Sequence, residues 1–313
     1  MSSSDSLIHS VAGAAGGIVA MSATYPLVVL STRAAVETRN EDKTTYQAVL
    51  DIIKREGVTG LYSGLSSSLL GIAVTNGVYY YFYERSKGAI VNSRSGSKGL
   101  STLESMLAGL IAGSATTLIS NPIWVIQTSQ AVQSMTPSHP SADPTASPIS
   151  PSPKKRGMFD TISYILRTGG LPAFWRGIGP ALVLVVNPVL QYTVFEQLKN
   201  ALVRRRKVRG SSGVLTDVDF FMLGALSKLV ATSATYPYIV VKSRLQAGQE
   251  HAQRYQSALH GLRTIVDEEG FGGLYKGVSS KLVQSVLTAA ILFAGQRRIY
   301  EMTKKAIAPI VLK

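Results

Sequence analysis

Apolar residues dominate six long stretches of the chain, and polar residues gather between them. Each stretch holds about 20 residues or more, which is enough for a helix to span a bilayer. Several are only marginally apolar, as the run from Ser66 to Phe82 shows. The pattern predicts six transmembrane helices, over residues 7–36, 66–87, 102–133, 179–200, 217–246 and 279–304.

Three landmarks recur in the same order along the chain, which indicates an internal repeat. The first is a proline inside each odd-numbered helix, at Pro26, Pro122 and Pro237. The second is a glycine two residues after an aromatic residue, at Gly64, Gly177 and Gly277. The third is an aromatic-Glu-x-x-Lys pattern, at Glu84 and Lys87, Glu196 and Lys199, and Glu301 and Lys304. We predict repeat one over 7–95, repeat two over 101–209 and repeat three over 215–305.

The repeats predict how the helices associate. Glycines four residues apart, such as Gly109 and Gly113, let neighbouring backbones approach closely. A proline kinks a membrane helix when neighbours satisfy the carbonyl that it frees. One repeat cannot shield its polar face from lipid, so three repeats close around a polar cavity. We predict an all-α membrane protein, one domain over residues 1–313, with six transmembrane helices in three homologous repeats and pseudo-threefold symmetry.

Two kinds of segment depart from the repeats. The tract from Met135 to Pro153 is rich in proline and serine without an apolar period, so we predict a disordered insert over 135–153. The basic runs Arg204–Lys207 and Lys154–Arg156 are typical of a membrane surface with anionic lipids. Targeting or nucleic-acid binding is the alternative interpretation of these runs.

Composition narrows the function classes. A net charge of +14 with only 16% charged residues indicates, in a membrane protein, anionic lipids or an anionic cargo. The absence of cysteine excludes disulfides and thiol nucleophiles. The four histidines lack metal-ligand spacing, and no phosphate-binding Gly-x-x-x-x-Gly-Lys-Ser/Thr loop is present. We therefore expect no enzyme, ATPase pump, bound metal or cofactor.

The landmarks together resemble the mitochondrial carrier family over about residues 7–304. The stretches Tyr25–Arg33, Asn121–Ile126 and Tyr236–Arg244, with Leu287–Ala290, are similar to its peroxisomal branch, which includes adenine nucleotide carriers. The resemblance implies a monomeric carrier in the peroxisomal membrane that works by alternating access. The mitochondrial inner membrane is the alternative location.

The chain also departs from the family motif, which places an acid two residues and a base five residues after each proline. The +2 residues are Val28, Trp124 and Ile239, so the acid is missing three times. The +5 residues are Ser31, Gln127 and Lys242, and the +7 residues are Arg33, Ser129 and Arg244. The usual inner ring of salt bridges therefore cannot form.

The resemblance also implies an outer gate on the cytosolic side. Its residues would be Glu84, Lys87, Glu196, Lys199, Glu301 and Lys304. At the opposite end, Arg33, Lys242 and Arg244 lie beyond the prolines, at an inner mouth. These three cations could attract a polyanion, but the preference for positive residues on one side of a membrane explains them equally well.

Lys228 breaks the threefold symmetry, because its counterparts are Gly17 and Gly113. An unpaired ammonium inside an apolar helix is costly, so it faces water or an anion. Since the scaffold is threefold and a cargo is not, we predict that Lys228 binds a phosphate or carboxylate of the cargo. A structural ion pair or a snorkelling lysine is the alternative.

The even helices carry the main contact points of the resembled family seven residues after each landmark glycine. These positions are Gly71, Leu184 and Gln284. We predict that Gly71 and Leu184 leave room for a base, while Gln284 and Lys281 bind base or phosphate. An interhelical hydrogen bond is the alternative role of Gln284.

The sequence thus predicts a transporter that exchanges anionic nucleotides, such as ATP and AMP, across the peroxisomal membrane. Coenzyme A, NAD or FAD are alternative cargoes on the same fold. A membrane receptor or scaffold that transports nothing is the alternative of another class. We expect anionic lipids and a small nucleotide as partners, and no nucleic acid.

Overall fold

The computed structural model describes residues 3–38, 45–93, 100–133, 135, 156–208, 210, 214–248, 255 and 257–292. Repeats one and two run as a long helix, a short helix and a second long helix, as predicted, and repeat three has the same order of helices up to Leu292. The odd-numbered long helices are α1 (Ser3–Val36), α4 (Thr102–Val132) and α8 (Asp217–Ala247). The short helices are α2 (Thr45–Glu56), α5 (Met158–Gly169) and α10 (Ala258–Gly273).

The even-numbered long helices differ among the repeats. Repeat one has one continuous helix, α3 (Leu65–Asn92), which extends beyond the predicted end at residue 87. Repeat two divides its helix into α6 (Ile178–Val183), the 3-10 turn η3 (Leu184–Val186) and α7 (Asn187–Val208). The helix of repeat three is described over Val278–Leu292. The 3-10 turns η1 (Val58–Tyr62) and η2 (Leu171–Trp175) precede the even helices of repeats one and two.

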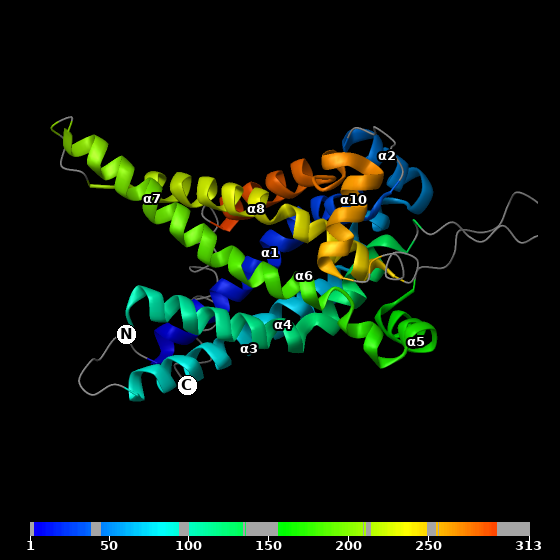
Figure 1. Cartoon of the computed structure of the whole chain (residues 1–313), viewed down its shortest axis with the longest axis horizontal. Helices are drawn as coiled ribbons and strands as arrows, with labels where there is room; N and C mark the ends of the chain where they lie inside the picture. Colours follow the sequence, from blue (N-terminus) through cyan, green and yellow to red (C-terminus); the bar gives the residue numbers. More distant parts are fainter. Residues whose placement is uncertain are drawn as a thin grey trace, which may run out of the picture.

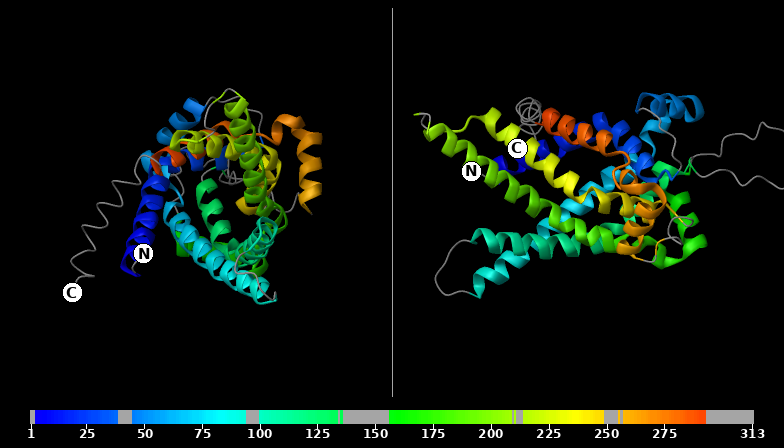
Figure 2. Two further views of the ribbon diagram at one scale, coloured as in Figure 1. Left: turned by 90° about the vertical axis from the view of Figure 1, so that its left-hand side faces the viewer. Right: turned by 45° about the horizontal axis from the view of Figure 1, so that its top comes forward.

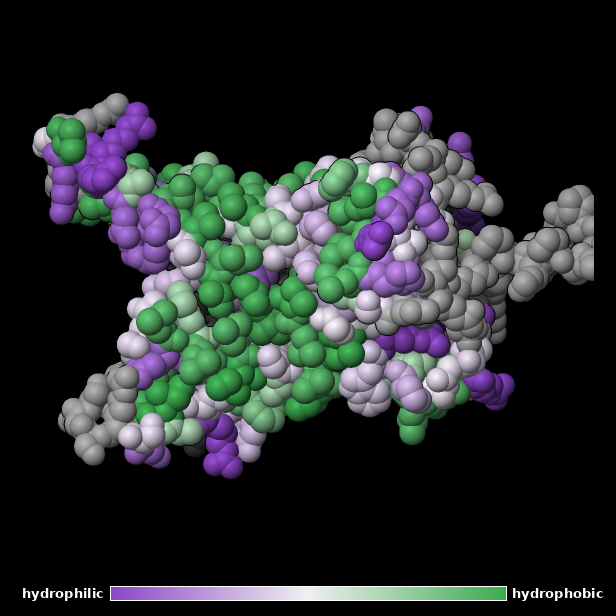
Figure 3. Space-filling view, viewed as in Figure 1, coloured by the Kyte–Doolittle hydropathy of each residue, from purple (hydrophilic) through white to green (hydrophobic). Residues whose placement is uncertain are grey.

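Within the described residues, five helical segments are long and apolar enough to cross a membrane, and the shorter Val278–Leu292 is apolar as well. Figure 3 shows a broad hydrophobic surface across the middle of the molecule, with hydrophilic residues towards its ends. The fold is therefore the predicted all-α membrane bundle. Residues 136–153 of the predicted insert lie outside the described part of the chain, as do Glu301 and Lys304.

The two ends of the bundle differ. Figures 1 and 2 show α2, α5 and α10 together at one end, which we call the inner end. At the opposite, outer end, α3 and α4 diverge from α7 and α8. The inner halves of the odd helices are buried, including Val29, Val125 and Val240 at 0 to 1% exposure. Among the described residues, the odd helices are therefore packed together at the inner end, while α3 and α4 lie apart from α7 and α8 at the outer end.

Prolines lie within all three odd helices, and the helices continue through them. Proline removes the hydrogen bond to the carbonyl four residues earlier. For Pro122 that carbonyl belongs to Leu118, and the indole N–H of Trp175 donates to it at 2.9 Å. The aromatic residue of the second landmark thus satisfies a carbonyl that the first landmark frees.

The landmark glycines lie where a helix of one repeat packs closely against the next repeat. Gly64 and Gly177 adopt φ angles of 88° and 71°, in the region that favours glycine. A Cβ on Gly64 would lie 3.0 Å from the carbonyl oxygen of Gln127, and one on Gly177 would lie 3.1 Å from that of Lys242. Each glycine therefore packs its even helix against the odd helix of the next repeat.

Candidate functional site

Three lysines of repeat three form the most distinctive group in the bundle. Lys228 and Lys242 lie on α8 and Lys281 on Val278–Leu292, and all three are partly buried. The charges of Lys228 and Lys242 both act on the ammonium of Lys281. Within the described residues, none of the three makes a hydrogen bond or ion pair. We call these residues the lysine column.

The spacing explains why the column runs along the bundle. Lys228 and Lys242 are 14 residues apart, which is nearly four turns of one helix and about 21 Å along its axis. They therefore lie on a similar face of α8, and Lys281 interacts with both from the neighbouring helix. The column extends from the middle of α8 towards its inner end.

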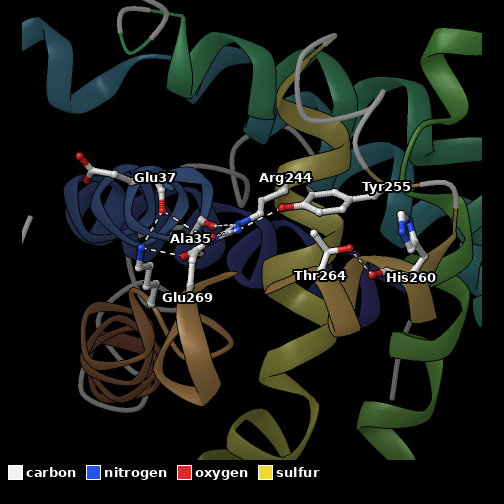
Figure 4. Close-up of polar contacts among 8 residues, drawn as sticks. Ala35, Glu37, Arg244, Tyr255, His260, Thr264 and Glu269 are labelled. Carbon is white, nitrogen blue, oxygen red and sulfur yellow. Dashed lines mark hydrogen bonds and ion pairs between the residues drawn. The ribbon is translucent and has the colours of Figure 1, made fainter. Parts of the chain in front are cut away.

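The other two predicted inner-mouth cations are already paired. Arg33 Nη1 donates to Glu56 Oε1 at 2.5 Å, and Arg244 Nη1 donates to Glu269 Oε1 at 2.5 Å. Figure 4 shows Arg244 between Glu269, the carbonyls of Ala35 and Glu37, and the hydroxyl of Tyr255. These two clamps join α1 and α8 to the short helices of their own repeats. Of the three inner-mouth residues, only Lys242 therefore has no protein partner among the described residues.

Repeat two has lost both partners of the clamp. Ser129 replaces the arginine, and Gly169 replaces the glutamate. In the other repeats a glycine four residues after the glutamate makes room for it, since a Cβ on Gly60 would lie 2.7 Å from the Cβ of Glu56. Repeat two has Ala173 at that position. Repeat two thus has a smaller residue in place of the glutamate and a larger one in place of the glycine. The packing is kept, and the ion pair is absent.

Gln284 lies in a hydrogen-bonded contact between repeats three and one. Its side chain is 8% exposed, and its Nε2 donates to Thr288 Oγ1 at 3.1 Å. Thr288 Oγ1 lies 3.0 Å from Thr24 Oγ1 on α1. Gln284 therefore bonds within its own helix and reaches α1 only through Thr288, and both its interhelical role and its cargo role stay predictions.

The space predicted beside Gly71 contains a tryptophan. A Cβ on Gly71 would lie 3.4 Å from Ile123 and 3.4 Å from the indole of Trp124. Trp124 Nε1 donates to Thr75 Oγ1 at 3.2 Å, and the indole is partly exposed. Leu184 begins the 3-10 turn η3 and is also partly exposed. A base at this level would meet the face or edge of an indole rather than an empty glycine surface.

The outer-gate residues that the structure describes pair within their own helices. Lys87 Nζ lies 3.4 Å from Glu84 Oε2, and Lys199 Nζ lies 2.6 Å from Glu196 Oε1. The first pair is about 45% exposed and the second 30%. Pairing between repeats, which the outer gate requires, stays a prediction.

We expect Glu196→Lys or Glu84→Lys to impair exchange, because closing the outer end would then bring like charges together. A compensating reversal on the neighbouring repeat, Lys199→Glu with Glu84→Lys, should recover part of the activity, since coupled residues are not additive. Thermal stability should change little, because exposed ion pairs contribute ~0–1 kcal/mol. Strict additivity of the two single effects would show that these are ordinary solvated charges.

Spacing alone did not identify two residues of interest. Trp124 is predicted only as a residue that replaces an acid, although a partly exposed indole at this level of the bundle is a candidate contact for a planar group. Gln246 was not singled out. It lies nine residues after Pro237, where the other repeats have Ala35 and Ala131, and it is 2% exposed. The same threefold comparison that identified Lys228 would have found it.

The described part of the chain contains no group of three or more His, Asp or Glu side chains placed to hold a metal ion. The side chains described in the middle of the bundle offer ammonium groups, hydroxyls, amides and an indole for contact with a cargo.

Comparison with known proteins agrees with this architecture. The family model described as mitochondrial carrier protein matches residues 2–94, 98–206 and 215–309, which are the three repeats. The peroxisomal nicotinamide adenine dinucleotide carrier of Arabidopsis thaliana is 40% identical over 93% of this chain and 94% of its own. Peroxisomal membrane protein PMP47B of Candida boidinii is 34% identical over 92% of this chain and 84% of its own. Peroxisomal membrane protein PMP34 of Mus musculus is 33% identical over 92% of this chain and 91% of its own.

These findings confirm the predicted family and its peroxisomal branch. The relatives are carriers and peroxisomal membrane proteins, so the predicted peroxisomal membrane location is confirmed as well. The chain belongs to the mitochondrial carrier family, as a solute carrier of the peroxisomal membrane.

Proposed function

We propose that this carrier exchanges adenine-containing nucleotides across the peroxisomal membrane by alternating access. The lysine column is the observation that supports the proposal most strongly. Three lysines lie along one repeat without an acidic partner among the described residues. The cargo that they fit carries several negative charges close together, as a pyrophosphate or phosphate chain does.

Energetics support an anionic cargo. An unpaired charge at membrane depth is costly, and residues of this kind mark substrate pathways. Asp217 and Asp219 are the acids of α8, and both lie in its first turn at the outer end, about 13 Å or more along the helix axis from Lys228. A phosphate group that enters from the outer end would neutralise the column. The proposal assigns the phosphates to Lys228, Lys281 and Lys242.

The base has a separate place in the proposed pose. Trp124, Gly71 and Leu184 belong to repeats one and two and offer apolar surface and an aromatic ring, and base–aromatic stacking contributes ~1–3 kcal/mol. A nucleotide could then bridge the charged repeat three and the apolar surface of the other two. An ion-pair scaffold without transport would not need this asymmetric arrangement.

Exchange rather than one-way transport follows from the same charges. An empty column leaves uncompensated ammonium groups inside the membrane, so the unloaded carrier should change conformation slowly. A bound nucleotide removes this penalty in both directions. The carrier should therefore need a nucleotide on the far side to complete its cycle.

The cargo within this class is the finer part of the proposal. ATP and AMP are the nucleotides predicted from the sequence. The 40% identity to the Arabidopsis NAD carrier favours NAD as a second candidate, which has the same adenine and a pyrophosphate. All three offer an adenine for the indole and phosphates for the lysines.

A binding panel tests this assignment. A ligand that binds the folded state raises the melting temperature as its concentration exceeds its Kd. We expect ATP, ADP, AMP and NAD to stabilise the purified carrier in detergent, and adenosine, which lacks phosphate, to have no effect. Sodium triphosphate and UTP serve as controls for the phosphate chain and for the base. Stabilisation by adenosine, or by no adenine nucleotide at all, would contradict the proposal.

A further inference from the structure

The outer end of α7 is attached to α8 along one side of the helix. Phe195 stacks on Phe220 of α8, with ring centroids 6.4 Å apart. Further along α7, Arg206 Nη2 donates to Asp219 Oδ1 at 2.6 Å, and Arg206 Nη1 donates to Val214 O at 2.7 Å. Phe195 and Arg206 are about three helical turns apart, so they lie on nearly the same side of α7. The two contacts together fix which side of α7 faces α8.

The side of α7 that faces away from these contacts carries two arginines. Arg204 and Arg205 are exposed, and neither makes a hydrogen bond or an ion pair within the part of the chain that the structure describes. Ala201 and Val208 lie on the same side, about one turn before and one turn after them. A hollow of about 390 Å³ is lined by these four residues. Its volume lies within the range of about 300–1,000 Å³ that is common for small-ligand sites.

The contacts with α8 also give the depth of this hollow in the membrane. Asp219, the partner of Arg206, lies in the first turn of α8. Its neighbours Val218, Phe220 and Met222 are exposed apolar residues, as is typical of a helix surface that meets lipid. Figure 3 shows hydrophilic residues at the outer end of α7 beside the broad hydrophobic surface. The arginines therefore lie at the boundary of the apolar surface, which is the level of the lipid headgroups.

The two arginines lie on a different side of α7 from its predicted gate residues. Glu196 and Lys199 pair with each other at 2.6 Å. At 3.6 residues per turn, the midpoint of this pair lies about 160° around the helix from the midpoint of Arg204 and Arg205. Since the gate residues are expected to face the cargo path, the arginines face the surrounding lipid.

We propose that Arg204 and Arg205 bind the headgroup of one anionic phospholipid at the outer end of the bundle, with its phosphate in the hollow beside them. Guanidinium groups bind phosphate oxygens through paired N–H donors, and arginine is suited to this contact. Ala201 and Val208 offer apolar surface to the part of the lipid next to the phosphate. A zwitterionic lipid has the same phosphate, but its own cation competes with the arginines.

The position of the site favours a lipid over an acidic protein segment, because headgroup phosphates already lie at this level of the bundle. Of the basic run Arg204–Lys207, only the first two residues form the site. Arg206 is engaged with α8, and Lys207 lies on another side of the helix. The inference does not rest on the proposed nucleotide exchange.

A fluorophore next to the hollow tests which lipid occupies it, because the chain has no cysteine of its own. Gln197 is exposed one turn before Ala201, so Gln197→Cys is labelled and the full chain is placed in phosphatidylcholine vesicles. A small fraction of the lipid carries a nitroxide quencher high on its acyl chain, on either phosphatidylglycerol or phosphatidylcholine. At equal amounts, we expect the phosphatidylglycerol quencher to be at least about threefold more effective, because each arginine attracts anionic lipid.

Matched variants in the same labelled background locate the effect. Arg204→Gln/Arg205→Gln should be quenched equally by the two lipids, whereas Lys207→Gln should keep the difference. Equal quenching of the labelled carrier without these substitutions would overturn the proposal, as is expected for solvated charges or for an acidic protein partner. An undiminished preference in the double variant would overturn it as well, because the preference would then arise elsewhere. Nucleotide exchange is measured separately, and its absence would contradict the proposed function without changing the lipid result.

Discussion

Replacing Lys228 with glutamine is expected to reduce nucleotide exchange at least tenfold, which corresponds to ~1.4 kcal/mol. Lys228 is partly buried, has no described protein partner and interacts electrostatically with Lys281. The substitution removes one charge from the column but keeps a side chain of similar length. Initial rates of labelled nucleotide uptake into nucleotide-loaded liposomes measure the effect.

Two controls separate a cargo role from a structural one. Lys207→Gln removes an exposed lysine at the end of α7 and should leave exchange unchanged. Lys228→Arg keeps the charge and should retain part of the activity, although the larger guanidinium is not equivalent to an ammonium. If Lys228→Gln exchanges nucleotides at the wild-type rate, the site assignment is wrong. A large loss of melting temperature without nucleotide would place Lys228 in a structural ion pair instead.

Glu269→Gln is expected to lower the free energy of unfolding by ~3–5 kcal/mol, because it leaves the charge of Arg244 buried and without its acid. Arg244 is 0% exposed at its side chain and Glu269 is 5% exposed, and Lys276 Nζ also lies 2.8 Å from Glu269 Oε2. Thermal or denaturant unfolding of the carrier in detergent measures the loss. Asp267→Asn, which affects an exposed pair with Arg263 on the same helix, should cost less than about 1 kcal/mol.

The same clamp predicts a pH dependence. Burial alone would raise the pKa of Glu269, but hydrogen bonds from Arg244 and Lys276 outweigh it and hold the pKa below its ordinary value. A carboxyl with a lowered pKa in the folded state contributes stability that is complete above its unfolded pKa of about 4.3 and is lost as the pH falls through the folded value. Wild type should therefore lose stability on acidification below that range more steeply than Glu269→Gln. Parallel curves would show that the clamp does not titrate in this way.

The repeats made most of the fold predictable from the sequence. Recurring prolines, aromatic-x-Gly landmarks and helix-end charges give the order and number of helices, because each repeat must place equivalent residues at equivalent depths. The division of the second even helix into α6, η3 and α7 was not predictable from this pattern. Pro188 lies four residues after Leu184 and cannot donate to its carbonyl, so the break has a local cause that repeat two does not share with the landmark pattern.

The candidate site was predictable only in part. Lys228 stood out because its counterparts are glycines, but the grouping of Lys242 with Lys281 depends on how two helices are aligned. The inner-mouth prediction placed Arg33 beside Lys242 and Arg244, whereas the structure pairs both arginines with glutamates of the short helices. Spacing of three residues could have indicated the Glu84–Lys87 and Glu196–Lys199 pairs, since such side chains lie on one face of a helix.

Counter-exchange in liposomes tests the central claim most directly. The purified wild-type carrier is placed in liposomes loaded with ATP, AMP or NAD, and uptake of labelled AMP and labelled NAD is followed over time. We predict rapid uptake of at least one labelled adenine nucleotide into loaded liposomes and slow uptake into empty ones. Uptake no faster than in liposomes without protein, for every nucleotide tested, would contradict the assignment of this chain as a nucleotide exchanger.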